Sequence, residues 1–260
     1  MRIIYIGHAT LLIELGGKRF LTDPNFDPAL GKFLSRVSPP GIPIDRLPEI
    51  DAIFVTHAHA DHLSFNSLDQ LPKVPIFSPP AIARWLKRRG YGEATAIGPG
   101  ESVNAGKVEI HAASATHKGH RYGVDRWRGA ANMYLFATKE LSCFFAGDTA
   151  LTPDSTSMVE SHLLPHGRRL DMALLPIGHP PKWKLEGFRK GHLTTTDALT
   201  LFERLGARYL IPYHWGTFNH VTSGAHDAIN QLKIELPGHG RREDVRILEP
   251  GTAFELPTVS

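Results

Sequence analysis

Four potential metal ligands stand within six residues of one another, directly after a short apolar run. The run is Ala52-Ile53-Phe54-Val55, and the ligands follow in His57-Ala58-His59-Ala60-Asp61-His62. A continuous apolar stretch of this length predicts a buried strand, so the four side chains are expected in the turn that leaves it. His57 and His59 alternate and therefore point to one side of an extended backbone, whereas Asp61 and His62 can turn toward a second point. The natural interpretation is one metal held by the first pair and another held by the second.

Further histidines and one aspartate follow other apolar runs in the same manner. The runs, each with the residue that follows it, are Val108–Ala112 with His117, Ser142–Ala146 with Asp148, and Tyr209–Pro212 with His214. Crevices form outside the carboxyl ends of strands in an open α/β sheet, and zinc requires three or four protein ligands. We therefore expect these side chains to join the motif at one sheet edge. His120, close to His117 in sequence, is the alternative third ligand, and we prefer His117.

Short apolar runs separated by turn residues predict strands through much of the chain. The expected strands are Arg2–Ile6, Thr10–Leu15, Arg19–Thr22, Ala52–Val55, Val108–Ala112, Met133–Ala137, Ser142–Ala146, Met172–Leu175 and Tyr209–Pro212. Helices are expected over Pro79–Arg89, from Pro153, over Thr194–Leu205 and over Ala225–Leu236. The sequence contains no fixed-period repeat and no linker that divides it. These features predict a single α/β domain over residues 1–260, with sheets inside and helices outside.

Three long segments have no predicted element: Pro24–Pro48, His117–Asn132 and Gly178–Gly191. Loops of this length inside a compact domain are commonly functional, so we expect them to form the walls of an active site. The second and third surround a tryptophan with cations, which suits an anionic group; these residues are Lys118, Arg121, Arg126, Trp127, Arg128, Lys182, Trp183, Lys184, Arg189 and Lys190. The first segment, Pro24–Pro48, is apolar and contains Phe26, Leu30, Phe33 and Leu34. We expect it to form a wall or lid of the active site, or a contact between two copies of the chain.

The composition indicates a metal-binding protein and gives no sign of a nucleic-acid-binding or membrane-spanning one. Fifteen histidines stand against one cysteine and four methionines, an excess that indicates metal binding or proton transfer. A net charge of +3 gives no reason to expect a nucleic-acid partner. No apolar run approaches the about 18–20 residues of a membrane-spanning helix, and the start lacks the pattern of a secretory signal. Cys143 stands alone, so no disulfide can form within the chain, and a cytoplasmic location is expected.

These motifs together resemble those of the metallo-β-lactamase fold superfamily, over nearly the whole chain. Thr56–His62 resembles its His-x-His-x-Asp-His motif, Phe145–Thr149 its Gly-Asp motif, and His214 its last histidine. The most similar branch includes N-acylphosphatidylethanolamine-hydrolysing phospholipase D and the ascorbate-6-phosphate lactonases. The segments that point to this branch are Gly7–Thr10, Leu21–Pro24, Leu174–Gly178 and His214–Phe218. The resemblance implies a four-layer αβ/βα sandwich of two mixed sheets flanked by helices.

The resemblance also implies a ligand set and an activity. One divalent metal would be bound by His57, His59 and His117, the second by Asp61, His62 and His214, with Asp148 bridging them. Nitrogen ligands with hard oxygen suit zinc and tolerate manganese or iron. The implied enzyme is a dinuclear metal-dependent hydrolase that uses a metal-bridging hydroxide on a small, anionic phosphodiester or lactone.

The remaining implied roles belong to side chains around the metals. Asp61 would orient the attacking hydroxide and accept its proton, and His192 would protonate the leaving group. His8 and Asp23 are expected to hydrogen-bond the ligands and orient them.

Several alternatives stay open at this point. The same metal centre serves thioester and amide hydrolases of the glyoxalase II and β-lactamase kind, and a non-catalytic protein could keep the metals for binding. The superfamily's nucleases are disfavoured by the small net charge. Phospholipase-type relatives tend to have His-Trp at the third ligand and an aromatic residue shortly after the Pro-Ile-Gly turn. This chain has His117-Lys118 and His179-Pro180 there, a departure that concerns lipid specificity and leaves the ligand set intact.

Overall fold

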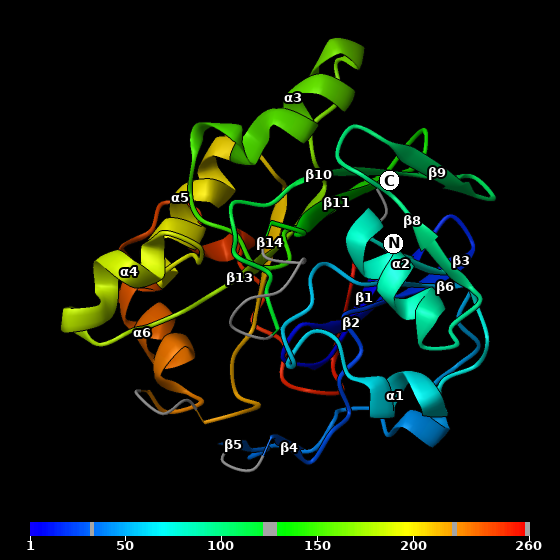
Figure 1. The fold of residues 1–260 in the computed structure, drawn as a ribbon. Coiled ribbons are helices and arrows are strands. Elements are labelled where there is room, and N and C mark those ends of the chain that lie inside the picture. Colours follow the sequence, from blue (N-terminus) through cyan, green and yellow to red (C-terminus); the bar gives the residue numbers. More distant parts are fainter. Residues whose placement is uncertain (32–33, 122–128, 220–222, 258–260) are drawn as a thin grey trace.

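Two mixed β-sheets lie face to face, with helices on their outer sides (Figure 1). The computed structural model describes residues 1–31, 34–121, 129–219 and 223–257. The seven-stranded sheet has the order β15-β1-β2-β3-β6-β7-β8, and the six-stranded sheet has the order β14-β13-β12-β11-β10-β9. A short hairpin, β4 (Ala29–Leu30) with β5 (Leu34–Ser35), stands apart from both sheets.

The strands of the first sheet are β1 (Arg2–Gly7), β2 (Thr10–Leu15), β3 (Lys18–Thr22), β6 (Ala52–Phe54), β7 (Ile76–Ser78), β8 (Ala94–Ala96) and β15 (Ala253–Glu255). Those of the second are β9 (Ser102–Ala105), β10 (Val108–Ser114), β11 (Asn132–Ala137), β12 (Ser142–Phe145), β13 (Met172–Pro176) and β14 (Tyr209–Tyr213). The helices are α1 (Phe65–Gln70), α2 (Pro80–Arg88), α3 (Ser157–His162), α4 (Leu185–Arg189), α5 (Thr195–Leu205) and α6 (Asp227–Glu235).

The strand pairings bring several carboxyl ends to one edge of each sheet. β1 and β3 are each antiparallel to β2, and β3 is parallel to β6, so β1, β3 and β6 run in one direction. In the second sheet β10 and β12 are each antiparallel to β11, and β12, β13 and β14 are parallel. The residues that follow these strands are therefore delivered together.

Alternation along the first strands explains the layers. Ile3 and Tyr5 of β1 face the core between the sheets, whereas Ile4 and Ile6 face a second core under α1 and α2. Such period-2 alternation is what a sheet buried on both faces requires. Between the sheets, the Phe136 ring of β11 lies 4.9 Å from that of Phe54 in β6 (centroid to centroid). The predicted helix–sheet–sheet–helix sandwich is confirmed.

The longer predicted elements are also found. Helix α5 begins after Thr194, whose side chain forms a capping box with Asp197, and it ends at Gly206, whose φ of 59° suits glycine. Helix α2 begins after Pro79 and buries the apolar face that contains Trp85 and Leu86. The helix expected from Pro153 is a 3-10 turn that continues into α3.

The segments without a prediction contain short elements. Pro24–Pro48 includes the β4–β5 hairpin, and Gly178–Gly191 includes a 3-10 helix over Lys182–Lys184 followed by α4. In the described part of the chain, no helix is long and apolar enough to cross a bilayer. Phe33, Arg126, Trp127 and Arg128 lie outside the described residues.

Candidate metal centre

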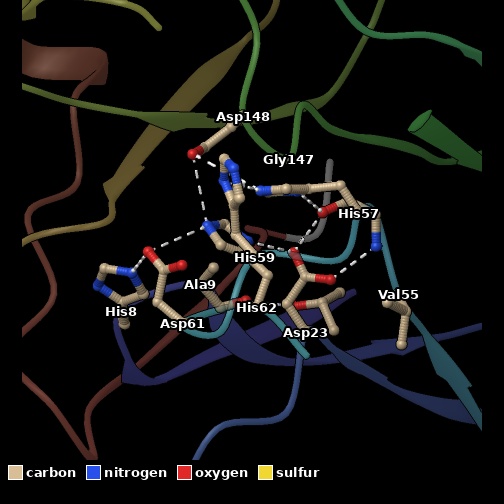
Figure 2. A network of polar contacts seen from close by, with 12 residues as sticks. His8, Ala9, Asp23, Val55, His57, His59, Asp61, His62, Gly147 and Asp148 are labelled. Carbon is tan, nitrogen blue, oxygen red and sulfur yellow. Dashed lines mark hydrogen bonds and ion pairs between the residues drawn. The ribbon is translucent and has the colours of Figure 1, made fainter. Parts of the chain in front are cut away.

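All seven predicted metal ligands gather where the carboxyl ends of the two sheets meet. Figure 2 shows five of them, His57, His59, Asp61, His62 and Asp148. The motif loop follows β6, and His117, Asp148 and His214 follow β10, β12 and β14. One group that could hold a cation comprises His57, His59, His117 and Asp148, and a second comprises His8, Asp61, His62 and His214. The sequence-based expectation that these residues lie together agrees with the geometry.

Backbone strain is concentrated at this edge. Among the non-glycine residues that the structure describes, only His8, Asp23 and His214 have positive φ, at 56°, 34° and 72°. Such conformations persist only where the surrounding contacts enforce them, and they cluster at functional sites. Here His214 N donates to the His8 carbonyl (3.0 Å), so two of the strained residues hold each other.

In the first group, unprotonated ring nitrogens of His57 and His117 face the His59 ring. His57 Nδ1 donates to Thr56 Oγ1 (2.9 Å), which in turn donates to Asp23 Oδ2 (2.7 Å). His117 Nδ1 donates to the Gly191 carbonyl (2.7 Å). In the neutral rings both Nε2 atoms are therefore acceptors, and they lie 2.9 and 3.1 Å from His59 Nδ1. One proton on His59 cannot satisfy both of these acceptors.

The second group is oriented in the same way. His62 Nδ1 donates to Asp23 Oδ2 (2.8 Å), which directs His62 Nε2 toward His214 Nε2 at 3.2 Å. Asp61 Oδ2 accepts from His8 Nε2 (2.9 Å) and lies 3.6 Å from His214 Nε2. Asp23 thus orients His62 directly and His57 through Thr56, one histidine in each group.

Asp148 lies between the two groups. Its side chain is 3% exposed, its Oδ2 is 4.0 Å from His57 Nε2 and 3.5 Å from His62 Nε2, and its Oδ1 is 3.5 Å from His214 Nε2. Oδ1 is buried and has no hydrogen-bond partner within the described chain. The turn before it needs glycine, because Gly147 has a φ of 58° and a Cβ there would lie 2.7 Å from a methyl carbon of Thr56.

These residues fit divalent cations. A buried carboxylate oxygen without a donor, beside facing imidazole lone pairs, is costly unless a cation lies between them. Imidazole nitrogen with carboxylate oxygen is a donor set for zinc and also for manganese or iron. The opposite ring nitrogens donate to oxygen, as is usual for metal-binding histidines.

Charges within the cluster shift the pKa values of its acids. Burial alone would raise the pKa of Asp148, but His214 and His62 outweigh it and hold the pKa well below its usual range. The pKa of Asp61 is likewise held well below its usual range, since His62 and hydrogen bonds from His214 and His8 outweigh burial. Both carboxylates are therefore ionised and able to bind a cation at neutral pH.

The metal-free protein should lose stability as the pH falls from about 7 to about 5. Burial lowers the folded-state pKa of five clustered histidines: His8, His57, His59, His117 and His192. For His8 and His117 it falls to about 3. In His62 and His214 burial acts in the same direction, but Asp148 outweighs it and their pKa is raised.

The sign of the pH dependence follows from these directions. A histidine with a lowered pKa stays neutral in the folded chain while its unfolded form binds a proton below about pH 6.5, so its stabilisation is lost as the pH falls. The two histidines with a raised pKa have the opposite effect on stability. We expect a net loss of stability because five histidines with a lowered pKa stand against these two. Urea unfolding of chelator-treated protein at pH 7 and pH 5 tests this, and an equal or larger free energy of unfolding at pH 5 contradicts it.

Two further histidines were singled out from the sequence. His120 lies beside the His59 ring (5.6 Å between centroids), but its Nδ1 bonds to the Lys118 carbonyl, and it contributes no atom to either group. His117, by contrast, belongs to the first group. His192 Nε2 lies 3.5 Å from Asp148 Oδ2, and its Nδ1 donates to the Phe188 carbonyl (3.3 Å).

Two of the loop cations make hydrogen bonds within the protein. Arg121 donates through Nη1 to the carbonyls of Leu63 (2.6 Å), directly after the motif, and Ala58 (3.3 Å), within it. Arg189 pairs with Asp197 of α5. Both guanidinium groups therefore bind to the fold itself. Neither contact was foreseen, because the sequence does not show which carbonyls the fold leaves without donors.

Replacing Arg121 by alanine should weaken zinc binding about tenfold, because partners that fix metal-binding loops contribute about 10–100-fold to affinity. Arg121→Lys should restore part of the loss, since one amine can still reach one carbonyl. Competition with a chromogenic chelator measures this, with exposed Arg46 replaced by alanine as control. Unchanged zinc affinity in Arg121→Ala contradicts this account of the loop.

Comparison with known proteins gives a consistent result. A family described as "Beta-lactamase superfamily domain" matches residues 18–215. A UPF0173 metal-dependent hydrolase of Shouchella clausii is 27% identical, with 98% of this chain and 100% of that protein covered. N-acyl-phosphatidylethanolamine-hydrolyzing phospholipase D 1 of Caenorhabditis elegans is 29% identical over 82% of this chain, which spans 63% of that relative's length.

Among solved structures, an isothiocyanate hydrolase from Delia radicum gut bacteria superposes with a TM-score of 0.77 at 19% identity. The superposition covers 98% of this chain and 99% of the other. At 19% sequence identity, this structural similarity shows that the two proteins share a fold.

Proposed function

This chain belongs to the beta-lactamase superfamily, and we propose that it is a hydrolase that uses two divalent metal ions to cleave a phosphodiester or a lactone. The observation on which this rests most is the buried Asp148 Oδ1, which has no hydrogen-bond partner in the described part of the chain and lies between two sets of histidine nitrogens. Relatives with full-length coverage are named metal-dependent hydrolases, which supports the same class of reaction.

We assign the first ion to His57, His59 and His117, and the second to Asp61, His62 and His214, with Asp148 shared. When bound, such cations make a water molecule acidic enough to attack at neutral pH and polarise the oxygen on which charge develops. Zinc fits the donor set, and manganese or iron is compatible with it.

The protein supplies proton transfer and orientation. Asp61 is ionised and its Oδ2 is fixed by His8, so this carboxylate can accept and orient a proton of the attacking water. His192 lines the cavity beside the cluster, and since its Nδ1 donates to Phe188, a proton for the leaving group would be held on Nε2. Burial lowers the pKa of His192, which makes its protonated form a stronger acid.

Turnover of a chromogenic phosphodiester and a chromogenic lactone by zinc- or manganese-loaded protein tests the proposal. We expect hydrolysis of at least one, and its loss in a folded His57→Ala/His59→Ala double variant. Hydrolysis that persists in this variant, or no turnover of either substrate by protein with two bound metals, contradicts the proposal.

A further inference from the structure

A cavity of about 830 Å³ opens directly beside the metal cluster. Asp61, Asp148 and His192 form part of its wall, so a molecule that reacts at the cluster must lie in it. Its volume is within the range of about 300–1,000 Å³ that is usual for small-molecule sites. The shape and chemistry of this cavity therefore bear on the substrate.

Most of the cavity wall beyond the cluster is apolar. The apolar residues include Leu30, Leu34, Ile177, Phe188, Trp215, Phe218, Ala225 and Ala228. They come from the β4–β5 hairpin, the residues after β13, helix α4, the loop after β14 and the start of α6.

The hairpin is fixed against the opposite part of this wall. Val37 N, just beyond β5, donates to the Thr217 carbonyl (2.8 Å), and the Arg36 guanidinium lies 4.8 Å from the centre of the Phe218 ring. These contacts hold the residues after β5 against Thr217 and Phe218 in the absence of a ligand, and Leu34 and Phe218 both line the cavity. Burying one methylene on such a surface improves binding about fourfold.

Positive charge in the cavity is sparse. Lys184 is the one lysine or arginine among the described residues that line it. Nearby Arg36 donates to the carbonyls of Asp27 (2.8 Å) and Asn25 (2.7 Å), while Arg121 and Arg189 are engaged as described above.

Among the described residues, one acidic side chain outside the cluster lines the cavity, and it is hydrogen-bonded to a backbone amide. Asp227 also lines the cavity, and its carboxylate accepts from Gly224 N (2.7 Å). A phosphate monoester is usually met by several charged donors or by bidentate arginine. The described wall has one amine instead, which matches a single negative charge.

We propose, building on the hydrolase function proposed above, that the substrate has two recognition elements besides its scissile bond. One is an apolar group of several carbons that lies between the β4–β5 hairpin and the start of α6. The other is one anionic group that pairs with Lys184. Such an amphiphile fits the cavity better than a sugar phosphate, whose second negative charge would have no second lysine or arginine among the described lining residues.

Binding of n-alkyl sulfonates tests this without requiring hydrolysis. These monoanions are weak zinc ligands, so ethane-, butane-, hexane- and octanesulfonate can be titrated into zinc-loaded protein by calorimetry, with 1-octanol as neutral probe. We expect the Kd to fall about fourfold per added methylene up to the length that fills the cavity. A Kd that does not change with chain length overturns the apolar part of the proposal.

Matched variants separate the two elements. Lys184→Glu should weaken octanesulfonate at least about tenfold and leave octanol unchanged, whereas Lys182→Glu, in the same 3-10 turn but outside the wall, should change neither. Leu34→Glu should weaken the binding of both probes, and Val37→Glu, an exposed site beyond the same hairpin, should weaken the binding of neither.

Equal effects of each variant and its control on binding overturn the assignment, and melting curves verify that all four variants fold. Failure of the hydrolase function would appear separately, as absent turnover with these binding trends intact.

Discussion

Replacing Asp148 by asparagine is expected to lower hydrolytic turnover by about 10³-fold. Asp148 Oδ1 and Oδ2 lie within 4.0 Å of histidine nitrogens from both groups, so this one carboxylate serves both proposed ions. Asparagine keeps the volume and removes the charge. The loss should therefore come from weakened metal binding and not from a cavity or an altered fold.

The measurement is steady-state turnover together with metal content after gel filtration. Asp154→Asn, an exposed aspartate in the 3-10 turn after the same loop, is the control and should retain both activity and metal. An Asp148→Asn protein that keeps two metals and full turnover would show that the carboxylate is not shared between ions.

Removing the metals is expected to abolish turnover and to lower the thermal midpoint by about 5–10 °C relative to zinc-loaded protein. A ligand at 100 times its Kd stabilises the folded state by about 2.7 kcal/mol, and for a chain of this size each kcal/mol moves the midpoint by about 2–4 °C. The structural reason is the cluster itself, where His57 Nε2, His59 Nδ1 and His117 Nε2 converge without enough protons to satisfy them.

Differential scanning calorimetry of chelator-treated protein, with and without added zinc, measures this shift. The His57→Ala/His59→Ala variant is the control, because it lacks two of the proposed ligands and should gain much less from zinc. Equal zinc stabilisation of the variant and the parent would place the bound ion elsewhere in the protein.

Much of the site could be predicted because its evidence is local in sequence. The motif His57–His62 follows a buried strand within one short segment, and strand direction brings His117, Asp148 and His214 to the same edge. Long periodic elements such as α5 were predictable for a similar reason, since a capping box and a terminal glycine mark both ends.

The parts that could not be predicted depend on contacts between distant segments. The Gly191 carbonyl that fixes His117 is 74 residues away in sequence, and Arg121 bonds to Leu63 across 58 residues. Short strands such as β7, β8 and β15 are stabilised by their neighbours in the sheet and have little pattern of their own. The β4–β5 hairpin could not be predicted, because strands of two residues have no periodicity.

The proposed pair of metal ions is tested most directly by anomalous X-ray diffraction from crystals of the zinc-loaded protein. The account predicts two zinc peaks, one bounded by His57, His59 and His117 and the other by Asp61, His62 and His214, with Asp148 contacting both. A single peak, or peaks outside this cluster, would contradict the two-metal centre.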